Sequence, residues 1–212
     1  MLNSILAIIA AYVLGAIPFA IIVVRLVKGV DVRHYGSKNA GATNVYRVAG
    51  LKVALIVGIL DLAKGFVSVY LVPQLFPPGD ITSLLQLQLI CTVVVVLGHM
   101  FTIFAGFKGG KGVLAAAGAL LALLPLEVGL AFALFLITVI LTKYVSLGSI
   151  SAVLFLSLFV FFERFILNKQ IPDELLILST IIALVVALAH RSNISRLLSG
   201  TENKIGKPKS AE

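Results

Sequence analysis

Residues 84–112 read LLQLQLICTVVVVLGHMFTIFAGFKGGKG, and this stretch decides the fold. Its first two thirds are apolar and long enough to cross a bilayer as a helix, which takes roughly 20 residues. The run stops at a glycine-rich loop, Gly106–Gly112, that carries two lysines. Glycines let backbone N–H groups approach an anion closely, and a helix predicted to start at Val113 would point its N-terminus at the same anion. The stretch therefore predicts either a phosphate site at a membrane surface or an ordinary basic turn between two spans.

The whole chain has the composition of an integral membrane protein. Of its 212 residues, 60% are hydrophobic and 12% are charged, and the mean hydropathy is +1.12. A soluble domain has about 25% charged residues. The candidate spans are Ile5–Val24, Val53–Leu71, Leu84–Phe104, Val113–Leu124, Val128–Thr142, Leu147–Phe162 and Leu175–Ala189. We predict an all-α polytopic bundle of about seven transmembrane helices, with about five as the alternative, because Val113–Leu124 is short enough to be a half-helix or re-entrant segment.

Basic residues indicate the orientation of the bundle. They cluster after the first, third, fifth and seventh stretches, whereas the opposite loops hold only Arg164 and Lys169. By the positive-inside rule, the N-terminus lies outside and the C-terminus lies in the cytoplasm. The net charge of +8 then comes mostly from loops on the cytoplasmic side and reflects membrane orientation, which argues against a nucleic-acid partner. We predict one transmembrane domain over residues 1–200 and a polar cytoplasmic tail over 201–212, whose last residues are disordered.

Three hydrophilic segments fall on the same predicted side of the membrane: residues 35–47, the glycine loop with the preceding His99, and residues 190–196. The first segment lacks the apolar stripe of a helix and is rich in hydrogen-bonding groups, so we predict a functional loop rather than a plain connector. Its polar side chains are Ser37, Asn39, Thr43 and Asn44, followed by the guanidinium of Arg47, whose planar fork suits phosphate. The coincidence of three such segments favours a common site.

Polar residues also occur within the predicted spans. Asp61 and Lys64 stand three apart in the second span, where helical spacing lets them face each other. Charges inside a span are costly unless they are paired or line a polar cavity. The pair is therefore either part of a functional site or a lock between helices. Ser146 and Ser149 add hydroxyl groups at the sixth span, and Cys91 is predicted to be a buried core residue.

Several familiar chemistries are excluded by their missing motifs. The glycine loop is not a Walker A sequence, because Lys111 occupies the position of its second glycine and no Ser or Thr follows a Gly-Lys pair. No Gly-x-Ser-x-Gly elbow exists, and Asp31 has no evident partner, so a Ser-His-Asp hydrolase is unsupported. No histidine is followed by an aspartate at the spacing of the His-x4-Asp acyltransferases. No Cys/His cluster has metal-ligand spacing, and we predict neither a metal nor a cofactor.

The polar motifs together resemble one family. The motifs are GSKNAGATNV (36–45), GHMFTIFAGFKGGKGV (98–113) and HRSNISRLLSGTE (190–202), with 61–65 and 145–150 between them. They resemble the bacterial acyl-phosphate-dependent glycerol-3-phosphate acyltransferases, the PlsY family, over nearly the whole chain. The resemblance implies an enzyme of the bacterial cytoplasmic (inner) membrane, functional as a monomer among membrane lipids. Such an enzyme moves a fatty acyl group from acyl phosphate to the 1-hydroxyl of sn-glycerol 3-phosphate, giving lysophosphatidic acid and phosphate.

The resemblance also implies roles for individual residues. Ser37 and Arg47 match residues needed for activity, and His190 and Asn193 match functional residues of the last motif. Residues expected at the substrate or its phosphate are Asn39, Asn44, Lys108, Gly109, Gly110, Lys111, Gly112, Ser149 and Arg191. Residues expected to be structural are Asp61, Lys64 and Glu202. Thr102 departs from the family, which usually has proline there, and Leu114–Ala115 departs from its usual Ala-Thr; both put the local backbone geometry in question.

Acyl phosphate is an activated anhydride, so we predict direct transfer without an acyl-enzyme, driven by positioning and charge neutralisation. The sequence leaves three proton acceptor schemes open: His190 as general base, His190 as phosphate ligand, or a substrate phosphate as the acceptor. The alternative function is a membrane transporter of a phosphorylated metabolite, in which the same cations would line a path.

Overall fold

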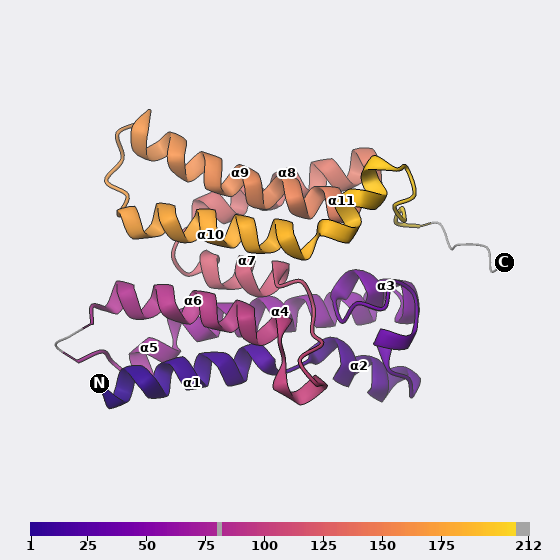
Figure 1. Ribbon diagram of the computed structural model, residues 1–212, viewed down its shortest axis with the longest axis horizontal. Coiled ribbons are helices and arrows are strands. Elements are labelled where there is room, and N and C mark those ends of the chain that lie inside the picture. Colours follow the sequence, from indigo (N-terminus) through magenta and orange to yellow (C-terminus); the bar gives the residue numbers. More distant parts are fainter. Residues whose placement is uncertain (80–81, 207–212) are drawn as a thin grey trace. The chain divides into compact units, whose positions relative to one another are not determined.

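All regular structure over the described residues, 1–79 and 82–206, is helical in the computed structural model (Figure 1). This confirms the predicted all-α class. The chain forms two compact units, Met1–Leu123 and Leu124–Glu212. The predicted disorder at the end of the tail lies outside the described residues.

The first unit is built on three long helices, α1, α4 and α6, together with shorter helices. Its elements are α1 (Leu2–Ala16), α2 (Phe19–Lys28), η1 (Val32–His34), α3 (Ala42–Ala49), α4 (Leu51–Tyr70), α5 (Val72–Leu75), α6 (Leu84–Met100), η2 (Ile103–Ala105) and α7 (Val113–Leu121). Helix α1 packs along α6, and α4 packs along α7. The start of α7 at Val113 confirms the predicted helix boundary after the glycine loop.

Glycines bring the paired helices of this unit into close backbone contact. A Cβ atom on Gly98 would lie 2.6 Å from the carbonyl oxygen of Tyr12, and one on Gly118 would lie 2.8 Å from the carbonyl carbon of Leu62. Real Cβ atoms do not tolerate these distances, so only glycine allows α6 to approach α1 and α7 to approach α4 this closely. Cys91 is fully buried on α6, as predicted.

The first predicted span, Ile5–Val24, is interrupted in the middle. Helix α1 ends at Ala16, Ile17 is extended, and α2 resumes after Pro18. Proline supplies no N–H group, and the last carbonyls of a helix have no donor from the helix itself. Side chains from later elements take their place: Thr102 donates to the carbonyl of Ala16, and Lys64 donates to that of Ile17 at 2.9 Å. The break is thus stabilised by α4 and by the turn after α6.

The prediction that residues 35–47 lack a helix is wrong for the second half of that segment, which begins α3. Gly41 is extended and immediately precedes the helix. Ala42, Val45 and Ala49 recur at helical spacing, and Val45 is fully buried against α2 and α4 neighbours in the local core. The apolar stripe is short and interleaved with polar residues, which is why the sequence pattern concealed it.

The second unit is a helical hairpin followed by a bent helix pair. Its elements are α8 (Pro125–Thr142), α9 (Val145–Phe165), α10 (Asp173–Ala189) and α11 (Arg191–Leu198). Helix α9 packs against both α8 and α10. Lys143 takes a left-handed conformation at the turn between α8 and α9 (φ 66°). The start of the tail returns to this turn, where the N–H of Ile205 donates to the carbonyl of Lys143 at 2.8 Å.

Length and hydropathy identify five spanning helices or helix runs among the described residues, or six if the bent α10–α11 pair counts as one. The five are Leu2–Lys28, Leu51–Leu75, Leu84–Ala105, Pro125–Thr142 and Val145–Phe165. Helix α7 has nine residues, and at about 1.5 Å per residue it is too short to cross a bilayer. The chain is therefore a multi-pass membrane protein, while the count of about seven spans and the orientation stay predictions.

Candidate active site

The buried side chain of Asn44 holds the backbone around the start of the first polar segment by hydrogen bonds. Its side chain is 1% exposed. Its Oδ1 accepts the N–H of Ser37 at 2.8 Å, and its Nδ2 donates to the carbonyls of Val32 (2.9 Å) and Tyr35 (3.0 Å). Asn44 was predicted to bind substrate, and in the structure its amide makes these three hydrogen bonds to the backbone, so it braces the segment. It holds the chain so that Ser37 lies exposed at the surface.

A second brace joins this segment to the turn after α6. Arg33 donates to Asp31 through Nη2 (2.8 Å) and Nε (3.1 Å), and through Nη1 to the carbonyl of Ala105 (2.8 Å). The side-chain hydrogen bonds from Arg33 lower the pKa of Asp31 to about 2. Arg25 also lies 3.5 Å from the Asp31 carboxylate. No partner for Asp31 was evident from the sequence, although the Asp-x-Arg spacing at the start of a helical turn indicates one.

The glycine loop folds back onto the end of α6. The N–H of Gly109 donates to the carbonyl of Met100 at 3.0 Å, and that of Gly110 donates to His99 at 3.1 Å. The prediction that the loop glycines leave their N–H groups free for an anion is therefore wrong for these two. A Cβ on Gly110 would lie 2.8 Å from the carbonyl oxygen of Ala40 and would overlap the imidazole of His99. Glycine is required here for close packing rather than for open N–H groups.

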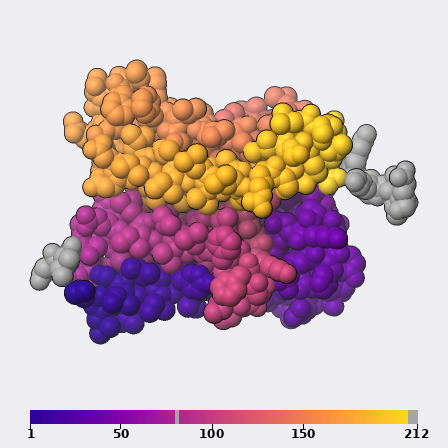
Figure 2. All heavy atoms as spheres, in the orientation of Figure 1, coloured from indigo at the N-terminus to yellow at the C-terminus, as the bar shows by residue number. Residues whose placement is uncertain are grey.

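The cationic groups and the helix end of this loop lie beside the packed glycines. Lys108 is exposed and Lys111 is half-buried. Gly112 has a left-handed backbone (φ 80°) that turns the chain into α7. The first-turn N–H groups of a helix have no acceptor within the helix, so the start of α7 is where backbone donors suit an anion. Figure 2 shows the segment after α6 at the surface, between the end of α1 and the α2–α3 region.

A buried ionic cluster lies directly behind the loop. Lys64 Nζ is 2.9 Å from Asp61 Oδ1, and His99 Nδ1 is 3.5 Å from the same oxygen. The predicted facing of Asp61 and Lys64 is confirmed, and His99 joins them from α6. A small cavity of about 10 Å³ is lined by these three residues together with Thr102, Gly109 and Gly110. The cluster and the glycine loop thus line the same cavity.

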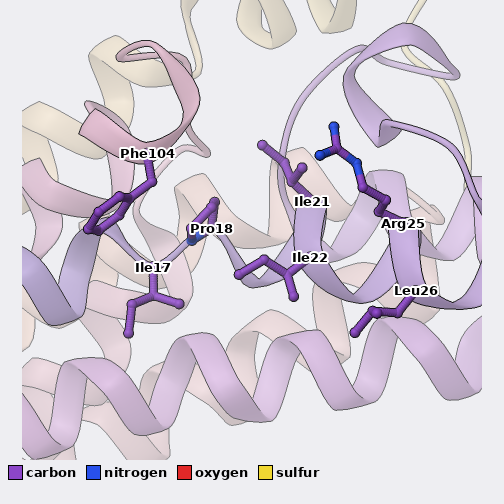
Figure 3. Close-up of a pocket in the computed structure, with 7 residues that line it drawn as sticks. All are labelled: Ile17, Pro18, Ile21, Ile22, Arg25, Leu26 and Phe104. Atoms are coloured by element: carbon purple, nitrogen blue, oxygen red, sulfur yellow. The ribbon is translucent and has the colours of Figure 1, made fainter.

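An apolar groove runs along the broken first span. Its volume is about 510 Å³, and it is lined by Ile17, Pro18, Ile21, Ile22, Arg25, Leu26 and Phe104. Figure 3 shows Ile17 and Phe104 at one end and Arg25 with Leu26 at the other. A mainly apolar channel with a guanidinium at one end suits an amphiphile with an anionic head.

In the second unit, Glu202 draws the last motif together. Its carboxylate accepts hydrogen bonds from Ser146 Oγ (2.9 Å), Asn193 Nδ2 (2.6 Å) and Arg196 Nε (2.7 Å). Burial alone would raise the pKa of Glu202, but the hydrogen bonds from Asn193, Arg196 and Ser146 outweigh it and lower that pKa. This geometry gives Glu202 a bracing role in which it fixes the amide of Asn193.

His190 lies at the bend between α10 and α11. Its Nδ1 is 2.8 Å from the carbonyl oxygen of Val186. A carbonyl only accepts hydrogen bonds, so Nδ1 carries the proton and Nε2 is the basic nitrogen of the neutral ring. Arg191 is exposed next to it. Ser149, predicted to bind substrate, is buried and donates to the carbonyl of Val145 within its own helix at 3.0 Å.

Comparison with known proteins identifies the family. Residues 5–200 match the family model for glycerol-3-phosphate acyltransferase. The glycerol-3-phosphate acyltransferase of Chlorobaculum tepidum is 39% identical over 226 residues, covering 97% of both chains. That of Fusobacterium nucleatum is 44% identical over 198 residues, covering 93% of this chain and 95% of the relative.

Two solved structures to which the chain is similar belong to the same class of enzyme as these relatives. The crystal structure of PlsY, an integral membrane glycerol 3-phosphate acyltransferase, in its glycerol 3-phosphate form matches with a TM-score of 0.83 and 37% identity over 96% of each chain. Its lysophosphatidic acid form matches with a TM-score of 0.80. The fold and the polar motifs are therefore those of a multi-pass membrane acyltransferase, and the transporter alternative is not supported. More particularly, the chain belongs to the glycerol-3-phosphate acyltransferase family.

Proposed function

We propose that this enzyme transfers a fatty acyl group from acyl phosphate to the 1-hydroxyl of sn-glycerol 3-phosphate, on the cytoplasmic side of a bacterial inner membrane. The observation that carries the proposal is the likeness to PlsY in two forms, one with glycerol 3-phosphate and one with lysophosphatidic acid. These are the acceptor and the product of one acyl transfer. No cofactor is needed, because the anhydride bond of the donor supplies the driving force.

The first unit would bind the phosphates. Lys108 and Lys111 flank the packed glycines, and the N-terminus of α7 follows directly. Arg47, in the last turn of α3, adds a guanidinium fork. Ser37, held by the Asn44 brace, orients the reacting groups through its exposed hydroxyl. The positive charges of the two lysines and of Arg47 would neutralise negative charge that is present on the substrates or develops at the carbonyl oxygen.

The last polar motif, which lies in the second unit, would supply the other catalytic groups. The glycerol oxygen attacks the acyl carbon, the bond from that carbon to the phosphate oxygen breaks, and inorganic phosphate departs. The hydroxyl proton leaves in the same step, and its candidate acceptors are Nε2 of His190, whose Nδ1 is tied to Val186, and a phosphate of the substrate. Asn193, fixed by Glu202, orients the reacting groups, and Arg191 binds phosphate.

The groove along α2 would take the acyl chain. Its apolar walls suit a hydrocarbon, and Arg25 at one end suits the phosphate of the donor. Filling the groove with Ile22→Trp, at a groove residue that is exposed, should lower activity with long-chain acyl phosphates more than with short-chain ones. Equal loss with all chain lengths would show that the chain binds elsewhere.

The direct test uses the purified protein in detergent with palmitoyl phosphate and glycerol 3-phosphate, and with palmitoyl-CoA as a parallel donor. Lysophosphatidic acid and phosphate are measured together. We expect product from acyl phosphate and none from the CoA thioester. Product from palmitoyl-CoA alone would overturn the donor assignment.

Ser37→Ala, with Ser192→Ala as an exposed serine control, tests the proposed chemistry. We expect a large loss of turnover for Ser37→Ala only. Near-normal turnover would remove Ser37 from the reaction. Isolation of an acyl-serine after mixing with acyl phosphate alone would overturn direct transfer.

A further inference from the structure

The ionic cluster behind the glycine loop has no part in the chemistry described so far. Asp61 is 2% exposed and Lys64 is 5% exposed, and both lie on α4 within a candidate span. Lys64 has a clear structural partner, since it caps the carbonyl of Ile17 at the break between α1 and α2. The buried carboxylate of Asp61 faces both Lys64 and His99, so it links that cap to the end of α6.

His99 bridges this carboxylate and the loop. Its Nδ1 faces Asp61 Oδ1, while its Nε2 side lies against Gly110 so closely that a Cβ there would overlap it. Its carbonyl accepts the N–H of Gly110 at 3.1 Å. The backbone and the ring of His99 therefore hold the same glycine from two directions. Since Gly109 and Gly110 separate Lys108 from Lys111, their placement sets the spacing of the two ammonium groups.

We propose that His99 is a positioning residue for the acceptor phosphate. With its Nδ1 facing Asp61, the His99 ring holds the Gly109–Gly110 pair in place, and the pair in turn fixes the positions of the two loop lysines. The inference rests on the proposed function, in which this loop binds glycerol 3-phosphate. His99 does not touch the substrate. Its contribution is to binding of the acceptor, not to the acyl-transfer step.

Two substitutions at His99 distinguish the contact of Nδ1 with Asp61 from the contact of Nε2 with Gly110. Asparagine places its amide near the position of Nδ1, so His99→Asn retains the Asp61 side and loses the contact with Gly110. Glutamine reaches the position of Nε2, so His99→Gln retains a group against the loop. The exposed His34 provides a matched control as His34→Gln.

The measurements are KM for each substrate, kcat, and equilibrium binding of labelled glycerol 3-phosphate. For His99→Asn we expect KM for glycerol 3-phosphate to rise about tenfold, because the packing contact that holds Gly110 is lost and the loop lysines are no longer fixed. We expect kcat and KM for acyl phosphate to change less than about twofold, the pattern of a lost binding interaction. His99→Gln should recover most of the affinity, and His34→Gln should match the wild type.

A purely structural role gives a different result. It would lower the yield and thermal stability of His99→Asn without raising KM for glycerol 3-phosphate in the folded fraction, and this would overturn the proposal. If His99→Asn does not fold, Asp61→Asn carries the same test, because it removes the charge on which the ring is seated. An unchanged KM in folded Asp61→Asn would equally overturn it.

Lys111→Ala distinguishes this inference from the proposed function. If Lys111→Ala leaves acceptor binding unchanged, the loop does not bind glycerol 3-phosphate and the proposed role of the loop fails. If Lys111→Ala weakens acceptor binding while His99→Asn does not, the loop assignment stands and only the positioning role of His99 fails.

Discussion

The hydroxyl of Thr102 donates a hydrogen bond to the carbonyl of Ala16, across 86 residues of sequence, at the point where the first span breaks. Thr102 is 1% exposed and stands where the family usually has proline. Its φ of −68° is one that proline also adopts. The departure therefore keeps the backbone conformation and adds a donor for a buried carbonyl.

Removing this hydroxyl should destabilise the first unit. Thr102→Val leaves the Ala16 carbonyl buried without its donor, and we expect a loss of about 1–3 kcal/mol in the free energy of unfolding. Thermal unfolding in detergent measures the change. Thr102→Ser retains the donor and should stay close to the wild type, and equal stability of the Val and Ser variants would contradict the role assigned to the hydroxyl.

Asn44 should act on catalysis through Ser37. Asn44→Asp replaces a donor that serves two carbonyls with a carboxylate oxygen, so donor and acceptor no longer match around residues 32–37. We expect turnover to fall at least about tenfold, since small displacements of a positioned group have large kinetic effects. Asn203→Asp, outside the braced segment, is the control for added charge. Normal turnover in Asn44→Asp would show that Ser37 does not need the brace.

Glu202 should make stability depend on pH in the acid range. Its pKa is lowered in the folded protein from the ordinary value of 4.5. A group of this kind stabilises the fold at pH above its unfolded pKa, and the stabilisation is lost as the pH falls through the lower folded pKa. Wild type should therefore unfold at a higher temperature than Glu202→Gln near neutral pH, and the difference should shrink below about pH 4.5. A difference that persists unchanged into strong acid would show that the charge of Glu202 is not involved.

Gly118 and Gly129 form a matched pair for testing helix contact. Gly118→Ala forces a Cβ against the backbone of Leu62, so α7 must move from α4, at a cost of about 1–3 kcal/mol. Gly129 lies exposed on α8 with open space around the Cβ position. Gly129→Ala should be neutral or stabilise by up to about 1 kcal/mol. Thermal unfolding of both variants tests this, and a stable Gly118→Ala would show that the helices are not held at this distance.

The features that the sequence predicted well were those set by local chemistry. Apolar length placed the helices, the glycine loop marked the start of α7 at Val113, and spacing by three paired Asp61 with Lys64. Each of these depends on residues that are neighbours in the chain or on one helix. The family motifs added the class of reaction, which the relatives support.

The features that the sequence missed were contacts between distant segments. Free N–H groups at Gly109 and Gly110 were a reasonable expectation from a glycine-rich loop, but the end of α6 accepts both. Asn44 looks like a substrate ligand until the backbone of Val32 and Tyr35 is seen around it. Sequence pattern reports which groups can form hydrogen bonds, whereas the fold decides which partners they meet.

The broken first span has a consequence for biosynthesis. The carbonyls at its break are satisfied by Lys64 and Thr102, which a ribosome adds long after Ile17. An unsatisfied carbonyl within a span is unfavourable in lipid. The Ile17 carbonyl also accepts the N–H of Phe19, whereas the Ala16 carbonyl lacks its side-chain donor until the chain has grown past residue 102. Nascent chains cut before that point should hold α1 and α2 loosely, and the native bend should become fixed when Thr102 emerges.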